Sequence, residues 1–265
     1  MASELIETVI LALSMVFLLT TGAILVIKGQ NKNDKAQIWL GVSFFSLLIL
    51  YIVWGLGLFE RYYTVYIIQL FVFIAATFFG KAAFYQNRKS AFPYIMIGTI
   101  LVGLIQVIQK VFEHHGIFPD FFAQDYYIHI DNLLSILWTA IPFGWMAHAA
   151  RKARKDLKTQ DVEPWILRRL TLIEISAVVE IFVSVPDLIK HAIDVNWDQS
   201  MWYLQIAIIT TFTVINFFAW AMPSWFKELL NKGKKEKTVA QIESEDETKM
   251  SEDAIMQELM EVYQT

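Results

Sequence analysis

The hydrophobic pattern of the chain consists of seven mostly apolar stretches separated by short polar connections. A helical stretch of about 20 apolar residues crosses the roughly 30 Å hydrocarbon core of a bilayer. Unpaired backbone groups are too costly in lipid, and the pattern lacks the alternating strands of a barrel, so we expect helices. The predicted spans are residues 9–27, 38–58, 66–83, 92–112, 132–150, 165–189 and 201–222. The predicted fold class is therefore an all-α membrane protein, a seven-transmembrane helix bundle.

Basic residues lie almost entirely on one side of this pattern. Nineteen of the 22 Lys and Arg residues fall in or beside the odd-numbered connections and in the C-terminal segment; the others are Arg61, Lys110 and Lys190. Because positive residues stay on the cytoplasmic side of a membrane, the N-terminus is predicted outside and the C-terminus in the cytoplasm. The outer side carries ten Asp and Glu residues and four of the five histidines. The two faces are therefore expected to differ in charge.

The chain is predicted to form one transmembrane domain followed by two short segments. Residues 1–222 hold the spans, and the basic residues 151–164 are expected to extend the fifth helix into the cytoplasm. Residues 223–237 form an amphipathic, basic juxtamembrane segment that anionic headgroups attract. Residues 238–265 carry eight Asp and Glu residues against one lysine and are predicted to be a mostly disordered cytoplasmic tail.

The composition excludes several kinds of chemistry. Without cysteine, the chain has no disulfide and no thiolate metal site. It has no Ser/His/acid triad, phosphate-binding loop or nucleic-acid motif, and no pair of histidines placed in mid-membrane for haem. The short connections leave no room for a soluble catalytic domain. We therefore expect a protein that is not an enzyme; a membrane enzyme acting on lipid is the alternative with least support in the sequence.

A polar stripe along the sixth predicted span is the main candidate site. Its members follow one another at helical spacings on one face: Ser176, Glu180, Ser184, Asp187 and His191. Glu180 falls near mid-membrane, where a lone charge costs at least ~2.5 kcal/mol. It is therefore expected to face the bundle, to be paired, or to be protonated. Glu180 either makes a packing hydrogen bond to a neighbouring helix or responds to protons or cations.

Polar residues in three other spans extend this candidate site. They are Gln106 and Lys110 in the fourth span, Asp131 at the start of the fifth and Asn216 in the seventh. Lys110 and Asp131 fall near the outer surface and can pair there. Together these residues suggest a polar, outward-opening pocket among the fourth to seventh spans. Polar groups are also ordinary packing devices between membrane helices, which is the alternative interpretation.

Three outer histidines form a second, weaker candidate. His114, His115 and His129 are residue types that bind divalent metals, but their spacing matches no defined site. Histidines in an acidic field also suit pH sensing. Metal binding, pH sensing and a merely solvated loop all remain open for this group.

Two short motifs and the topology resemble those of microbial rhodopsins and prokaryotic seven-helix membrane sensors. The motifs are Arg61-Tyr62 at the start of the third span and Pro186 in the sixth. The resemblance implies the same seven-helix bundle, with the N-terminus outside and the C-terminus in the cytoplasm. The rhodopsins also carry a retinal-binding lysine in the seventh helix and carboxylates in the third. Here residues 201–222 contain no lysine, with Asn216 as the nearest mid-helix polar residue, and residues 66–83 contain no carboxylate, so no covalent retinal and no cofactor are expected.

These observations predict a multi-pass protein of the plasma membrane that acts as a receptor or sensor. It would respond to a small ligand, proton or cation from outside. It would signal through a separate cytoplasmic protein that contacts residues 151–169 and the tail; membrane lipid is the other expected partner, and nucleic acid is not one. The alternative function is a transporter or ion channel with a polar path along the sixth helix.

Overall fold

The computed structural model describes residues 2–55, 63–85, 90–160, 162–186, 189 and 198–238. These residues are almost entirely helical and include no strand. The helices are α1 (Ala2–Lys32), α2 (Lys35–Gly55), α3 (Tyr63–Phe84), α4 (Phe92–His114), α5 (Pro119–Phe122), α6 (Asp125–Leu157), α7 (Pro164–Ile181), the 3₁₀ turn η2 (Phe182–Ser184), α9 (Asp198–Ala221) and α10 (Ser224–Thr238). The predicted acidic tail lies outside the described residues, apart from Thr238.

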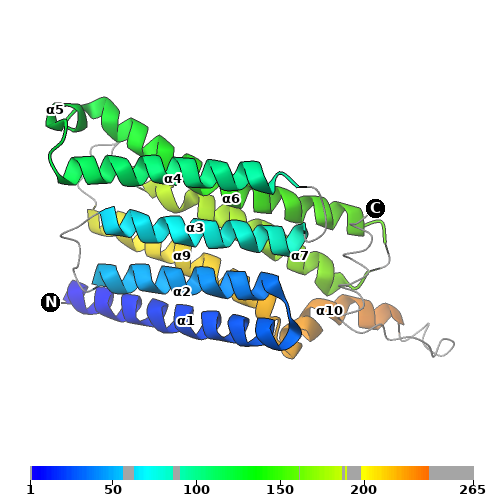
Figure 1. Cartoon of the computed structure of the whole chain (residues 1–265). Helices are drawn as coiled ribbons and strands as arrows, with labels where there is room; N and C mark the ends of the chain where they lie inside the picture. The colour runs from blue at the N-terminus through cyan, green and yellow to red at the C-terminus, as the bar shows by residue number, and fades with distance from the viewer. Residues whose placement is uncertain are drawn as a thin grey trace.

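The long helices run side by side along one common direction (Figure 1). The most extensive contacts join α1 to α2, α2 to α3, and α6 to α7. Helix α9 packs against both α7 and α1, which brings the C-terminal part of the bundle back to the N-terminal helix. The short α5 lies at one end of the bundle and α10 at the other (Figure 1).

Six of the described helices are long and apolar enough to cross a membrane: α1, α2, α3, α4, α6 and α9. The chain is therefore a multi-pass integral membrane protein. Helix α7 has 18 residues and carries four charged ones, Arg168, Arg169, Glu174 and Glu180, and it is not among these six.

The polarity of α4 is inverted relative to a helix of a soluble protein. Its buried positions are Thr99, Gly103, Gln106 and Lys110. Its exposed positions include Ile97, Leu101, Leu104 and Ile108, each at least 42 % exposed. Lipid accepts apolar side chains on the outside, whereas polar groups must find partners inside the bundle. This inversion is independent support for a lipid environment around α4.

Aromatic side chains connect four helices in the core. Phe73 of α3 contacts Trp138 and Phe143 of α6 edge to face, with ring centroids 4.9 and 5.8 Å apart. Phe212 of α9 in turn contacts Phe143 and Phe44 of α2 at 5.6 and 6.0 Å. Such pairs contribute about 0.5–1.5 kcal/mol each beyond the area they bury. They hold α2, α3, α6 and α9 in fixed register around the buried polar groups.

The α-helix of the sixth predicted span is interrupted after Ile181 by the 3₁₀ turn η2, and Val185, Pro186 and Ile189 are again helical. Pro186 has no backbone N–H, so it cannot donate to the carbonyl of Phe182 as the α-helical pattern requires. That carbonyl accepts a bond from the N–H of Val185 instead, which makes the turn 3₁₀. The change of helix type therefore comes two residues after Glu180.

The predicted helical extension of the fifth span is confirmed as far as Leu157, and the side of the membrane on which it lies stays a prediction. Helix α6 continues without a break from Asp125 to Leu157 and includes Pro142 in its interior. It also starts seven residues before the predicted span. At 1.5 Å per residue, a helix of 33 residues is about 50 Å long, well beyond a hydrocarbon core of about 30 Å. Part of α6 must therefore project from the membrane.

Candidate functional site

Glu180 lies in the last turn of α7, on the face that packs into the bundle. Only 3 % of the residue is exposed, and its Oε2 atom is buried without a hydrogen-bond partner. Ser176, one turn earlier, is fully buried but donates its hydroxyl to the carbonyl of Ile173 at 2.9 Å. Both residues thus occupy the buried face of α7, and the serine does not satisfy the carboxylate.

Helix α2 brings a second ionisable side chain, Tyr51, toward this carboxyl group. Tyr51 is 1 % exposed and lies within electrostatic range of Glu180. The two residues are 129 positions apart in sequence and belong to opposite halves of the chain. Their proximity makes the interior of the bundle, rather than the face of one helix, the environment of Glu180.

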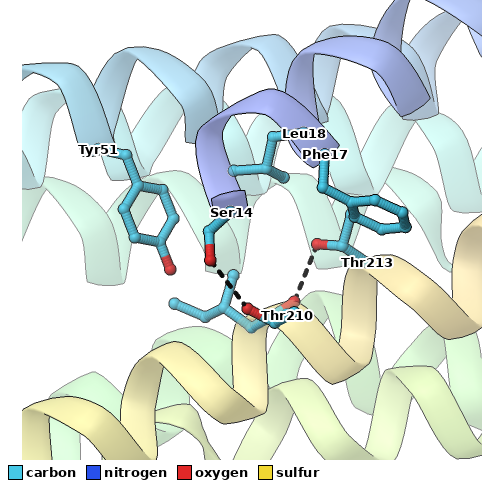
Figure 2. Close-up of a pocket in the computed structure, with 7 residues that line it drawn as sticks. Ser14, Phe17, Leu18, Tyr51, Thr210 and Thr213 are labelled. Carbon is cyan, nitrogen blue, oxygen red and sulfur yellow. Dashed lines mark hydrogen bonds between the residues drawn. The ribbon is translucent and has the colours of Figure 1, made fainter. Parts of the chain in front are cut away.

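Tyr51 also lines a narrow pocket between α1, α2 and α9 (Figure 2). The pocket is too narrow to hold a water molecule. Across it, the hydroxyls of Ser14 on α1 and Thr210 on α9 lie 3.3 Å apart, and Thr213 donates to the carbonyl of Ile209 at 2.8 Å. The hydroxyl groups from three helices therefore gather in the interior without leaving room for a small organic ligand.

Asn216, one turn along α9 from Phe212, is completely buried. Its amide Nδ2 donates to the carbonyl of Phe212 at 2.9 Å, while Oδ1 has no hydrogen-bond partner. Glu180 and Asn216 are therefore two of several described residues with a buried oxygen that has no hydrogen-bond partner; Gln106 and Asp131 are others. Each unsatisfied buried group costs roughly 1–3 kcal/mol, and the cost is greatest for an ionised group, so Glu180 is the one of the two whose protonation state matters most.

A second polar group joins α4 to α6. The Nζ atom of Lys110 lies 2.9 Å from Asp131 Oδ2 and 3.0 Å from Glu113 Oε2, and the lysine is 6 % exposed. Gln106 donates to the carbonyl of Asp131 at 3.1 Å and to Ser135 Oγ at 3.2 Å. This group, named here the lysine cluster, consists of Gln106, Lys110, Glu113, Asp131 and Ser135.

The candidate residues of the sequence thus fall into two groups on different helices. Lys110, Asp131 and Gln106 lie together between α4 and α6, and Glu180, Ser176 and Asn216 belong to α7 and α9. The backbone of Ser184 is part of η2. The side chain of Ser184, together with Asp187 and His191, lies outside the described residues.

Sequence reasoning missed two residues of the interior, Ser14 and Tyr51. Each lies in a mostly apolar span without a charged residue at helical spacing, so neither was part of a polar stripe. The one available signal is the spacing of seven residues between Ser14 and Thr21, which are both buried on the same side of α1. That spacing places Ser14 and Thr21 on one face of the helix, but it does not show which other helix packs against that face.

The three histidines predicted to lie outside do not gather into one site. The rings of His114 and His115 lie 5.1 Å apart and both approach Tyr63, whereas His129 is exposed on α6. In the part of the chain that the structure describes, no three His, Asp or Glu residues lie close enough to hold a metal ion.

At the opposite end of the bundle from α5, ion pairs join the projecting part of α6 to α7. Arg154 Nη2 lies 2.9 Å from Glu174 Oε2, and Arg154 Nη1 donates to Thr171 Oγ1 at 3.0 Å. Arg151 is more distant, 3.9 Å from Glu174 Oε1. Arg154 therefore fixes α6 to the part of α7 that contains Thr171 and Glu174, which precedes Glu180 in the chain.

Replacing Arg154 with glutamine is expected to lower the free energy of unfolding by about 1 kcal/mol, because this partly exposed pair loses both its ionic and its hydrogen-bonded contact. Unfolding of the purified protein in detergent, followed by circular dichroism, measures the change. Arg151→Gln removes a charge that is 62 % exposed and is the matched control. An equal loss in the control would contradict a specific role for Arg154.

No family model matches the chain, and searches of curated proteins and of solved structures find no similar protein. The function is therefore inferred from the chain's own residues.

Proposed function

We propose that the chain crosses the membrane seven times, with the N-terminus outside, and works as a sensor of protons or of a small cation. Helix α7 would be the sixth of the seven spans. It packs between α6 and α9, which are both apolar enough to span, and so lies at their depth. The charged residues of α7 are compatible with a membrane-spanning position. Glu174 is ion-paired with Arg154, and the Arg169 guanidinium lies 4.4 Å from the centre of the Trp220 ring. The distribution of Lys and Arg supports the orientation.

The observation that carries the proposal is the buried Glu180 with a carboxylate oxygen that has no hydrogen-bond partner. A charge in such surroundings is stable only if a proton or cation neutralises it. Neutral and charged forms interact differently with the surrounding helices, so occupancy of the site shifts the balance between conformations. A proton or a small monovalent cation suits the narrow interior better than an organic ligand.

Helix α7 can transmit a conformational change from Glu180 to the end of the bundle where the basic residues of α6 lie. Two residues after Glu180 the helix becomes 3₁₀, a feature that often marks a hinge. In the other direction, Glu174 ties α7 to Arg154 on the projecting part of α6. A change at Glu180 that shifts α7 would therefore move α6 where it leaves the membrane. In the proposed mechanism, a cytoplasmic protein binds α6 and the tail at the plasma membrane and responds to this movement.

A transporter or channel is the competing function, and buried hydroxyls favour it. Ser14, Thr210 and Thr213 line the interior near Tyr51, and such groups can pass a proton or a cation between them. In the present conformation the space between them does not admit water. Transport would require this interior to open, whereas sensing requires only a shift of α7.

The absence of cysteine makes a direct test practical. Spin labels at Lys35→Cys and Lys152→Cys, both exposed positions near the basic end, report the distance between α2 and α6. In proteoliposomes, acidifying the outer solution or adding a cation is expected to shift this distance. Glu180→Gln, which cannot lose a proton, is expected to abolish the shift. Pulsed electron paramagnetic resonance measures the distance distribution.

The control and a flux measurement separate the hypotheses. Asp156→Asn neutralises an exposed carboxylate on α6 and should leave the response intact. If an ion or pH gradient drives a current that Glu180→Gln abolishes, the protein is a transporter and the sensor proposal fails. If neither the distance nor a current depends on Glu180, its buried carboxyl group serves packing alone.

A further inference from the structure

The short helix α5 and the residues beside it carry a group of exposed aromatic and aliphatic side chains. Its members are Ile117, Phe118, Phe121 and Tyr126, each at least 38 % exposed, and they are named here the aromatic patch. The patch lies at the end of the bundle where the chain passes from α4 to α6 (Figure 1). Single exposed apolar side chains are common on proteins, whereas several together mark a surface that meets an apolar medium or partner.

An apolar stripe of α6 leads into this patch. Tyr126, Ile130, Leu133 and Leu137 follow one another at spacings of four, three and four residues, and each is at least 41 % exposed. These spacings place the four side chains on one face of the helix. Because α6 is apolar enough to cross a membrane, its exposed apolar face meets lipid. The patch is therefore the end of a lipid-facing stripe.

Ring contacts connect the patch to the exposed face of α4 as well. Ile108 and Phe112 belong to that face, and the ring centroid of Phe112 lies 6.3 Å from that of Phe118. On the other side of the patch, the ring centroids of Phe121 and Tyr126 lie 5.8 Å apart. The patch thus joins the apolar faces of two helices, and the lipid that covers those faces also reaches the patch.

The backbone holds the most exposed ring of the patch in an unusual conformation. Phe118 is 65 % exposed and lies in the left-handed region, with φ 58° and ψ 51°. A bulky side chain rarely adopts this conformation, which persists where the surroundings compensate for its cost. Water supplies no compensating contact to an exposed phenyl ring, whereas lipid does.

The inner side of α5 covers the lysine cluster. Phe121 and Phe122 contact the ring of Tyr127, with centroids 5.6 and 4.8 Å apart. Tyr127 is 3 % exposed, its ring centre lies 5.8 Å from Lys110 Nζ, and its hydroxyl lies 3.5 Å from Glu113 Oε2. The position of α5 therefore determines how well the lysine cluster is shielded from water.

We propose that the aromatic patch inserts into the membrane at the boundary between headgroups and acyl chains and anchors α5 there. Aromatic rings are enriched at this boundary. Lipid is the occupant of the surface, in continuity with the apolar faces of α4 and α6. Insertion holds Tyr127 over the lysine cluster. That the leaflet is the outer one rests on the topology proposed above, whereas insertion itself does not.

A spin label at Phe118→Cys tests the insertion, because the chain has no cysteine of its own. The full-length protein is reconstituted at low density in phosphatidylcholine vesicles. Power saturation compares collisions of the label with oxygen, which concentrates in lipid, and with a water-soluble nickel chelate on both sides. Oxygen should dominate, and the measured depth should be about 5–10 Å into the boundary. Leu104→Cys, on the exposed face of α4, is the lipid reference, and Lys152→Cys is the aqueous reference.

Asp120→Cys is the matched control, because Asp120 is an exposed polar residue of the same short helix. Its label should collide mainly with the nickel chelate. A label at Phe118 that behaves like the one at Lys152 would place the patch in water and overturn the proposal. Few collisions with either reagent would show that a second copy of the protein covers the patch instead. Dominant oxygen at both Phe118 and Asp120 would place all of α5 in the hydrocarbon and contradict an anchor at the boundary. Tyr126→Cys repeats the measurement if Phe118→Cys does not fold.

Discussion

Lys110→Met is expected to destabilise the protein by about 3 kcal/mol, the largest effect of any single charge removal considered. The side chain of Lys110 is 7 % exposed and that of Asp131 is 17 % exposed. Methionine fills a similar volume but leaves the Asp131 carboxylate without its cation, and the Oδ1 atom of that carboxylate already lacks a hydrogen-bond partner. A buried charge left alone costs far more than the pair contributes.

Unfolding of the purified protein by a denaturing detergent, followed by circular dichroism, measures this change. Glu113→Gln is the matched control, because Glu113 lies 3.0 Å from the same lysine but is 44 % exposed. Water screens such a contact, so its loss should cost no more than about 1 kcal/mol. The double variant Lys110→Met with Asp131→Asn should recover part of the loss. Equal effects of Lys110→Met and Glu113→Gln would contradict a buried ion pair.

The pattern of apolar residues was sufficient to predict an all-helical, multi-pass membrane protein. Residues 92–112 became α4 and residues 201–222 became α9 with shifts of a few residues at the ends. This part is predictable because burial in lipid requires long apolar helices whatever their neighbours are. The number of membrane crossings and their orientation stay predictions, since α7 is shorter than the other long helices and carries four charged residues within its 18.

The candidate site was less predictable, because it depends on which helices touch. Helical spacing correctly placed Ser176 and Glu180 on one face, but it could not reveal that Tyr51 of α2 approaches that face. The contact between Ser14 and Thr210 joins residues 196 positions apart. Packing order among apolar helices is set by the fit of side chains such as Trp138 and Phe73, and no local pattern in the sequence encodes that fit.

One close approach in this packing predicts a second large effect. A Cβ atom added at Gly103 of α4 would lie 2.6 Å from Leu70 Cδ1 and 2.6 Å from Trp138 Cζ2. The leucine end can move, but Trp138 is 1 % exposed and contacts Phe73 edge to face, so its ring cannot. Gly103→Ala is therefore expected to separate α4 from α6 and to destabilise the protein by about 1–3 kcal/mol.

Gly98, on the same helix, separates this steric effect from helix propensity. A Cβ atom at Gly98 would lie 3.6 Å from Ile141 Cγ2, an ordinary contact, so Gly98→Ala should raise stability by up to about 1 kcal/mol. The two substitutions are chemically identical and differ only in what the new methyl group meets. Thermal unfolding in one detergent compares them directly. Opposite signs support the close packing of Gly103 against Trp138, whereas a shared gain would mean that α4 lies farther from α6 than the geometry indicates.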